Sequence, residues 1–145
     1  DTVRGLNILE ENGVTIQRNQ SVVIPGIAHI IGIDDPTGVH SANLPPPDFE
    51  LMKKEVPADL PVIVMNHQPM YLEEIKSLGA DLQLSGHTHD GQIWPFKFLN
   101  KLVFKYQNGL FKLDDMYLYV SAGTGFWGPP LRIGTYSEIT VLNLI

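Results

Sequence analysis

The 145-residue sequence contains no cysteine, which excludes a disulfide framework and a thiolate metal site. It also has no excess of positive charge, because ten lysines and arginines stand against sixteen aspartates and glutamates, for a net charge of −6. Nucleic-acid binding is driven by the neutralisation of phosphates, so we expect no nucleic-acid-binding patch.

Long apolar runs are missing as well. No run approaches the ~20 residues that a membrane-spanning helix needs, and no basic segment followed by an apolar core indicates a signal peptide. Internal repeats and low-complexity segments are absent, and the length suits a single domain. Because the chain begins with Asp1 rather than Met, we expect a processed product or an excised piece of a longer protein.

The N-terminal third combines one helix with short strands. Residues 6–12 predict the last turns of a helix that ends at Gly13. Alternation over residues 14–18 and 21–24, and the apolar run 27–33, predict an antiparallel meander.

The middle of the chain predicts a parallel unit. Residues 37–47 indicate a loop, after which Asp48 is expected to open a helix. The apolar run 61–65 is typical of a strand that is buried on both faces. A helix over residues 71–78 and a strand over 81–85 complete a strand–helix–strand pattern, which implies a parallel pair with a crossover.

The C-terminal third predicts mostly antiparallel structure. Asn108-Gly109 is a hairpin dipeptide, expected to join residues 103–106 to residues 110–112. Residues 116–120 and 139–144 alternate as strands. The fold class is therefore α/β with much antiparallel β, and no linker divides the chain.

Three of the five histidines, His67, His87 and His89, directly follow the two strands of the parallel unit. Ligands bind outside the carboxyl ends of parallel strands, so we expect the three imidazoles at one edge of the sheet. Gly86 lets the backbone bend before His87 and His89. In an extended segment, the side chains of these two histidines point to the same side. Imidazole suits zinc, iron, manganese or nickel. One histidine alone is more often a hydrogen-bonded loop residue, but both motifs together favour a metal site.

These residues resemble a known family. Asn66-His67-Gln68-Pro69 and Gly86-His87-Thr88-His89 are similar to the C-terminal half of the calcineurin-like metallophosphoesterases. A bacterial branch of that superfamily, with members attached to or exported across the cytoplasmic membrane, matches three longer stretches. They are Leu84-Ser85-Gly86-His87-Thr88-His89-Asp90-Gly91-Gln92, Ile31-Gly32-Ile33-Asp34-Asp35-Pro36 and Gly125-Phe126-Trp127-Gly128-Pro129-Pro130-Leu131-Arg132.

The family's N-terminal motifs do not occur in this sequence. Asp-x-His, Gly-Asp-x-x-Asp and Gly-Asn-His-Asp/Glu would supply a bridging Asp, an Asn ligand and the catalytic His. The resemblance therefore implies that residues 1–145 are a single-domain fragment, the C-terminal half of a metallophosphoesterase β-sandwich flanked by helices. The catalytic histidine would lie upstream of this chain.

The resemblance also implies a two-metal mechanism, in which two divalent ions (Mn, Fe, Zn or Ni) clamp phosphate oxygens and activate a water. By the family pattern, His67 and His87 would bind one metal and His89 the other. The substrate would be a small or lipid-linked phosphoester, in a bacterial protein that is cytoplasmic or membrane-associated. Membrane association is expected only through segments outside this chain.

Four further residues are candidates for support of the metals or the substrate. Asp34 and Asp35 could orient a ligand histidine, or could belong to a routine turn before a proline. Asn66 could hydrogen-bond locally and has no firm ligand role. Arg132 could contact an anionic substrate or be an ordinary surface arginine. An aromatic group could face an apolar substrate or a membrane, or could pack in the core; it comprises Trp94, Phe96, Phe98 and Trp127.

Two classes of function remain open from the sequence. The chain is either part of a metal-dependent phosphoesterase, inactive alone, or a non-catalytic metal-binding or interaction domain on the same fold. In the first case we expect the N-terminal half, or another copy of the chain, to cover an incomplete sheet. The residues expected near its exposed edge are Val62, Ile63, Val64, Leu82 and Leu84.

Overall fold

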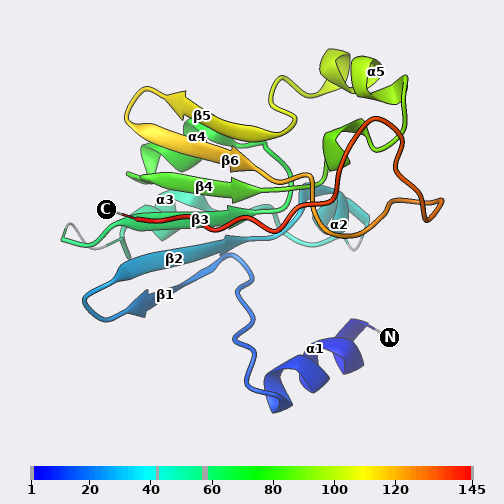
Figure 1. Ribbon diagram of the computed structural model, residues 1–145. Helices are drawn as coiled ribbons and strands as arrows, with labels where there is room; N and C mark the ends of the chain where they lie inside the picture. The colour runs from blue at the N-terminus through cyan, green and yellow to red at the C-terminus, as the bar shows by residue number, and fades with distance from the viewer. Residues whose placement is uncertain (1, 42, 57–58, 145) are drawn as a thin grey trace.

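The computed structural model describes residues 2–41, 43–56 and 59–144 and contains one six-stranded sheet (Figure 1). The strands are β1 (Gln20–Ile24), β2 (Ala28–Ile33), β3 (Val62–Asn66), β4 (Leu82–Ser85), β5 (Gly109–Leu113) and β6 (Met116–Val120). The helices are α1 (Thr2–Glu11), α2 (Pro36–Ser41), α3 (Phe49–Lys53), α4 (Leu72–Ser77), α5 (Phe96–Val103) and the 3-10 turn η1 (His89–Gly91).

The sheet is mixed, with strand order β1-β2-β3-β4-β6-β5. Its four central strands, β2, β3, β4 and β6, run parallel, and antiparallel hairpins add β1 at one edge and β5 at the other. This confirms the α/β class, the parallel strand–helix–strand unit and the antiparallel pairing near the C-terminus. Because the central strands are parallel, their carboxyl ends meet at one edge, where the histidines follow.

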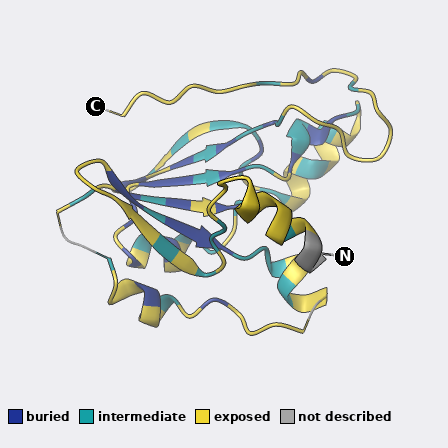
Figure 2. Cartoon of the chain, turned by 90° about the horizontal axis from the view of Figure 1, so that it is seen from below, coloured by how far each residue is buried: buried dark blue, intermediate teal, exposed yellow. Residues whose placement is uncertain are grey.

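The core lies on one face of the sheet, beneath α3 and α4 (Figure 2). Asp48 begins α3 by accepting a hydrogen bond from the Leu51 N–H at 2.9 Å, as the sequence predicts. Alternate strand residues point into this layer and are fully buried; they include Ile31, Val64, Met116, Leu118 and Val120. The parallel strands are therefore anchored from one side.

Val62, Val64 and Leu82 do not lie near an exposed sheet edge, so that expectation is wrong. They belong to β3 and β4 in the middle of the sheet and are buried. The hairpins protect these strands, because β1 extends the sheet beyond β2 and β5 extends it beyond β6. Ile63 and Leu84 are half-buried on the face opposite α3 and α4.

Two N-terminal expectations are also wrong. Residues 14–18 form no strand but cross close to β2, where a Cβ atom on Gly32 would lie 2.3 Å from the Gln17 Cβ. The packing of this segment over Gly32 takes the place of strand pairing. Part of the predicted loop 37–47 is helical, because the Asp35 carboxylate accepts the Thr37 and Gly38 N–H groups and starts α2. Residue 42, which belongs to the predicted loop 37–47, lies outside the residues that the structure describes.

The C-terminal hairpin turns at a different place from the one predicted. Gly109 begins β5, and the turn to β6 is at Asp114, whose φ is +55°. Asn108-Gly109 cannot join two strands because residues 103–106 lie at the end of α5 and beyond it. Residues 139–144 alternate like a strand but have no strand partner in the described structure.

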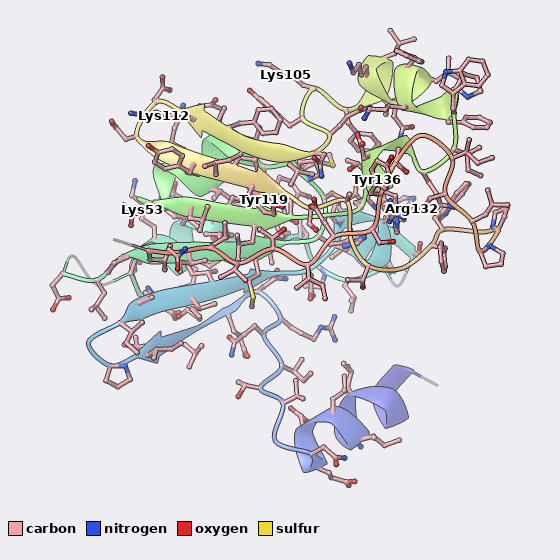
Figure 3. All side chains as sticks on the ribbon, viewed as in Figure 1. Lys53, Lys105, Lys112, Tyr119, Arg132 and Tyr136 are labelled. Carbon is pink, nitrogen blue, oxygen red and sulfur yellow. The ribbon has the colours of Figure 1, made fainter. Side chains whose placement is uncertain are left out.

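Glu138 ties the C-terminal segment to the open face of the sheet, on which Figure 3 labels Tyr119. Its carboxylate accepts hydrogen bonds from the Tyr119 hydroxyl at 2.8 Å, the Ala122 N–H at 2.9 Å and the Asn108 amide at 3.2 Å. Burial raises the pKa of Glu138, but these hydrogen bonds outweigh burial and leave the pKa below its ordinary value. The ionised carboxylate is thus the form that the folded chain favours.

Glu138→Gln should therefore lower the free energy of unfolding by about 1–3 kcal/mol at neutral pH. Since the folded-state pKa is depressed, the contribution of Glu138 is full above the ordinary pKa and is lost as pH falls through the folded value. Urea denaturation at several pH values should show wild type and variant converging in acid. The exposed Glu11→Gln is the matched control; a difference between wild type and Glu138→Gln that stays constant with pH would contradict the assignment.

Candidate metal centre

Two imidazoles meet where β3 and β4 end. His67 follows Asn66, the last residue of β3, and His87 lies two residues beyond the end of β4. The His67 Nε2 and His87 Nδ1 atoms are 3.2 Å apart, and the rings are nearly perpendicular with centroids at 5.1 Å. The Gly86 N–H donates to the His67 carbonyl at 2.9 Å, which holds the two loops together.

The nitrogen separation suits a shared metal ion. Two ring nitrogens that bind one tetrahedral ion at about 2.1 Å lie about 3.4 Å apart, close to the 3.2 Å between His67 and His87. Without an ion, the same separation fits a hydrogen bond in which one ring donates. Neutral imidazole serves either arrangement.

The bend in this loop lies at the histidines rather than at Gly86. His87, His89 and Asp90 adopt φ values of +68°, +49° and +50°, in the left-handed region that side chains disfavour. Gly86 has no positive φ, and a Cβ there would meet only the Ser121 carbonyl oxygen, at 3.8 Å. The expected role of Gly86 is therefore wrong: the strain falls on the residues with the candidate ligands, as is common at functional sites.

His89 begins η1 and contacts Arg132. The Arg132 guanidinium donates to the His89 carbonyl at 3.0 Å, and its Nη2 lies 3.4 Å from His89 Nδ1. Burial lowers the pKa of His89, and the charges of Arg132 and of His87 and His67 lower it further. Burial and the nearby His67 also lower the pKa of His87, against a smaller raising effect of Asp35. Both rings are therefore held in the neutral form that binds metals.

A cavity of about 580 Å³ contains all three histidines in its wall. The rest of the wall is largely apolar and includes Phe96, Phe104 and Trp127. The Phe104 ring packs edge-on against His87, with centroids 5.4 Å apart. A larger cavity of about 730 Å³ beside α4 holds none of the three histidines, so the smaller cavity is the candidate site.

The Asp34 carboxylate stabilises the fold rather than the candidate site. It accepts hydrogen bonds from Arg18 Nη2 at 3.0 Å and Arg18 Nε at 3.2 Å. This ion pair joins residues 14–18 to the end of β2. Asp35 is closer to the site, because it accepts from the Gln68 amide at 3.0 Å. Burial raises the pKa of Asp35, but hydrogen bonds and the nearby His67 outweigh it and lower the pKa. Of the two, only Asp35 is placed to support the histidines.

Asn66 and Arg132 occupy structural positions. The Asn66 amide donates to the Met70 carbonyl at 3.0 Å, and its buried Oδ1 has no hydrogen-bond partner in the part of the chain that the structure describes. Arg132 donates to the carbonyls of Ala122 at 2.7 Å and Gly125 at 2.9 Å as well as to His89 (Figure 3). The guanidinium thus fastens the 122–125 loop to η1 through its two Nη groups, while its buried Nε has no hydrogen-bond partner among the described residues.

Sequence reasoning overlooked two glutamines that support the site. Gln68 links Asp35 to Thr37 beside His67. Gln92 holds the loop that follows β6, since its Oε1 accepts the Trp127 N–H and its Nε2 donates to the Trp127 carbonyl, both at 2.6 Å. Both glutamines belong to the sequence motifs that contain the histidines. That position in the motifs is the signal from which their supporting role could have been predicted.

The three histidines do not form a complete metal site by themselves. Within residues 2–41, 43–56 and 59–144, no three His, Asp or Glu side chains are grouped to hold one ion. This agrees with the contacts of the three rings, since His67 and His87 approach each other whereas His89 approaches Arg132. The assignment of these histidines as metal ligands stays a prediction.

The chain is similar to several bacterial proteins. It is 39% identical to an uncharacterized metallophosphoesterase of Helicobacter pylori over 97% of this chain and 38% of that protein. It is 42% identical to the uncharacterized metallophosphoesterase Cj0846 of Campylobacter jejuni over 82% of this chain and 32% of that protein. The chain belongs to the metallophosphoesterase superfamily. The name of this superfamily describes hydrolases of phosphoesters and implies divalent metal ions.

A third metallophosphoesterase, YkoQ of Bacillus subtilis, is 34% identical over 97% of this chain and 53% of that relative. The chain thus spans from about a third to a little over half of the length of these three relatives. No family profile matches it, and no solved structure does. In the described part of the chain, no helix is both long enough and apolar enough to cross a membrane.

Proposed function

We propose that this chain is the C-terminal half of a phosphoesterase domain, in which His67 and His87 bind one divalent metal ion and His89 a second. The separation of 3.2 Å between His67 Nε2 and His87 Nδ1 carries the proposal, because it suits two nitrogens on one ion. Divalent ions polarise the phosphate and lower the pKa of the attacking water. Hydrolysis of a phosphomonoester or phosphodiester is the activity that we infer.

The residues of this chain position the ligands. The Gln68–Asp35 hydrogen bond lies beside His67 and brings a negative charge near two neutral imidazoles. Arg132 fixes the backbone of His89. Such supporting contacts orient metal ligands and favour one ring tautomer. The lowered pKa values of His87 and His89 keep both rings able to bind metal near neutral pH.

The wall of the histidine cavity favours a phosphoester with an apolar alcohol group. Phe96, Phe104 and Trp127 line this cavity together with the three histidines. Apolar walls gain free energy by taking apolar surface out of water. A lipid-linked or aromatic phosphoester therefore suits this cavity better than a small polar one.

Three neutral imidazoles are too few ligands for two tightly held cations, and they bring no negative charge. We infer that an N-terminal half supplies the bridging carboxylate, the amide ligand and the catalytic histidine that the resemblance implies. It would also cover the open sheet face, where Met65, Tyr117 and Leu110 are exposed. The unmatched length of the relatives leaves room for such a half.

The test is a metal titration and a rate assay, on the chain alone and combined with the N-terminal half, covalently or in trans. The chain alone should bind Mn²⁺ or Zn²⁺ weakly and hydrolyse an aryl phosphoester slowly or not at all. The combined protein should bind metal tightly and hydrolyse the ester. Equal turnover by the chain alone would show that the ligand set is complete within it. Tight metal binding without hydrolysis would favour a non-catalytic metal-binding domain.

A further inference from the structure

Helix α5 has its polar and apolar sides reversed. Lys97 reaches inward, and its Nζ donates to the Asp90 carboxylate at 2.7 Å. Asn100 also faces inward and donates to the Thr88 carbonyl at 3.3 Å. Leu102 and Val103 point outward and are 84% and 74% exposed. A surface helix of a globular domain normally buries its apolar side.

The outer side of α5 forms what we call the α5 patch, together with the residue that begins the preceding turn. The patch consists of Trp94, Phe98, Leu99, Leu102 and Val103, all exposed. Figure 1 shows α5 at a corner of the molecule, beyond the ends of the strands and away from the layer of α3 and α4. No α5 residue is buried. Large apolar side chains grouped on two exposed turns indicate an interaction surface.

The charge around the patch is positive, although the chain as a whole is acidic. Residues 91–113 contain four lysines and neither aspartate nor glutamate, within a chain of net charge −6. Lys97 is paired with Asp90, and Lys112 lies on β5 away from the helix, so Lys101 and Lys105 are the two cations beside the patch. Lys101 lies on α5, and Lys105 lies just past its end, where Figure 3 shows it beside the helix. Neither forms an ion pair within the part of the chain that the structure describes. The surface is thus apolar at its centre, with free cations beside it.

We propose that the α5 patch docks on an anionic lipid bilayer. A short helix can lie in the plane of the interface with Trp, Phe and Leu among the acyl chains and Lys among the headgroups. Lysine side chains are long enough to keep their ammonium groups in the headgroup layer while their stems stay in the apolar region. Anionic headgroups match Lys101 and Lys105, whereas an uncharged apolar protein surface would leave both cations unmatched.

This inference does not require the chain to hydrolyse anything. It differs from the sequence expectation that only segments outside the chain reach a membrane. The patch also adjoins the histidine cavity, because Phe96 of α5 lines that cavity and is itself half exposed. If the proposed function holds as well, docking would bring the phosphate of a membrane lipid to the cavity mouth.

Vesicle flotation tests the proposal with the 145-residue chain, without added metal. Vesicles of phosphatidylcholine alone are compared with vesicles that also contain phosphatidylglycerol. We expect binding to the anionic vesicles, weakened by salt. The double variant Leu102→Asp/Val103→Asp should lower the partition coefficient about tenfold or more. Ile27→Asp is the matched control, since Ile27 is 62% exposed in the β1–β2 turn and should leave binding unchanged.

A second pair of variants tests the charge. Lys101→Glu/Lys105→Glu should remove the preference for anionic vesicles, whereas Lys53→Glu, on the far side of the molecule in Figure 3, should not. All these side chains are exposed, so circular dichroism should show folded variants. Absence of binding to either kind of vesicle would overturn the proposal. So would a loss of binding in Ile27→Asp as large as the loss in Leu102→Asp/Val103→Asp. If the chain does not bind vesicles, and light scattering shows a dimer that Leu102→Asp converts to a monomer, the patch instead binds a second copy of the chain.

Discussion

Replacing His87 by Ala in the protein that includes the N-terminal half is expected to lower kcat/KM for an aryl phosphoester about a thousandfold or more. His87 Nδ1 lies 3.2 Å from His67 Nε2, so the substitution removes half of the histidine pair that we assign to one ion. The metal content should fall along with the rate, because so few protein ligands hold each ion. Steady-state kinetics and metal analysis of the purified protein measure the two effects.

His40→Ala is the matched control for this experiment. His40 is exposed on α2 and does not line the histidine cavity, so its loss should leave both rate and metal content unchanged. Thermal unfolding should show whether His87→Ala keeps its fold despite losing the contact with Phe104. A folded His87→Ala protein with full metal content and nearly normal kcat/KM would refute the ligand assignment.

Gly91→Ala is expected to disrupt η1 and α5 together. A Cβ atom at Gly91 would lie 2.3 Å from the Lys97 Cα and 2.6 Å from the Lys97 backbone nitrogen, and φ is +78°. Backbone cannot yield as a flexible side chain can, so α5 must move away from the turn that starts at His89. The left-handed φ and the overpacking together should cost about 2–4 kcal/mol of unfolding free energy. Urea denaturation followed by circular dichroism measures this loss.

Gly86→Ala provides the contrast, five residues earlier in the same motif. Its Cβ would meet only the Ser121 carbonyl oxygen at 3.8 Å, an ordinary contact, and its φ is not positive. We expect a change in unfolding free energy within about 0.5 kcal/mol. If Gly86→Ala were as destabilising as Gly91→Ala, the close approach of Lys97 would not be the reason that position 91 needs glycine.

The parallel unit was predictable because its signals are local. The β-branched run 61–65, the helical spacing of 71–78 and the short strand 81–85 each indicate one element without reference to the others. Parallel strands then bring their carboxyl ends to one edge. The family and the approach of His67 to His87 followed from the same motifs.

The misplaced elements show where local signals fail. Residues 14–18 and 139–144 alternate like strands, but alternation says nothing about a partner, and the sheet already ends with β1 and β5. Asn108-Gly109 has the chemistry of a hairpin turn, yet α5 occupies the place of the strand that would precede it. Likewise, the neighbouring sequence does not show that position 91 requires glycine and that position 86 does not.

The sequence by itself determined the α/β class, the membership of a metallophosphoesterase superfamily and the three histidines at the ends of β3 and β4, because motifs and periodicity are properties of neighbouring residues. Only the tertiary structure decided what each supporting residue does. Arg132 meets His89, and Asp35 meets Gln68, across 43 and 33 residues of chain. The same holds for α5: its periodicity is that of any amphipathic helix, and only its packing against η1 turns the apolar side outward.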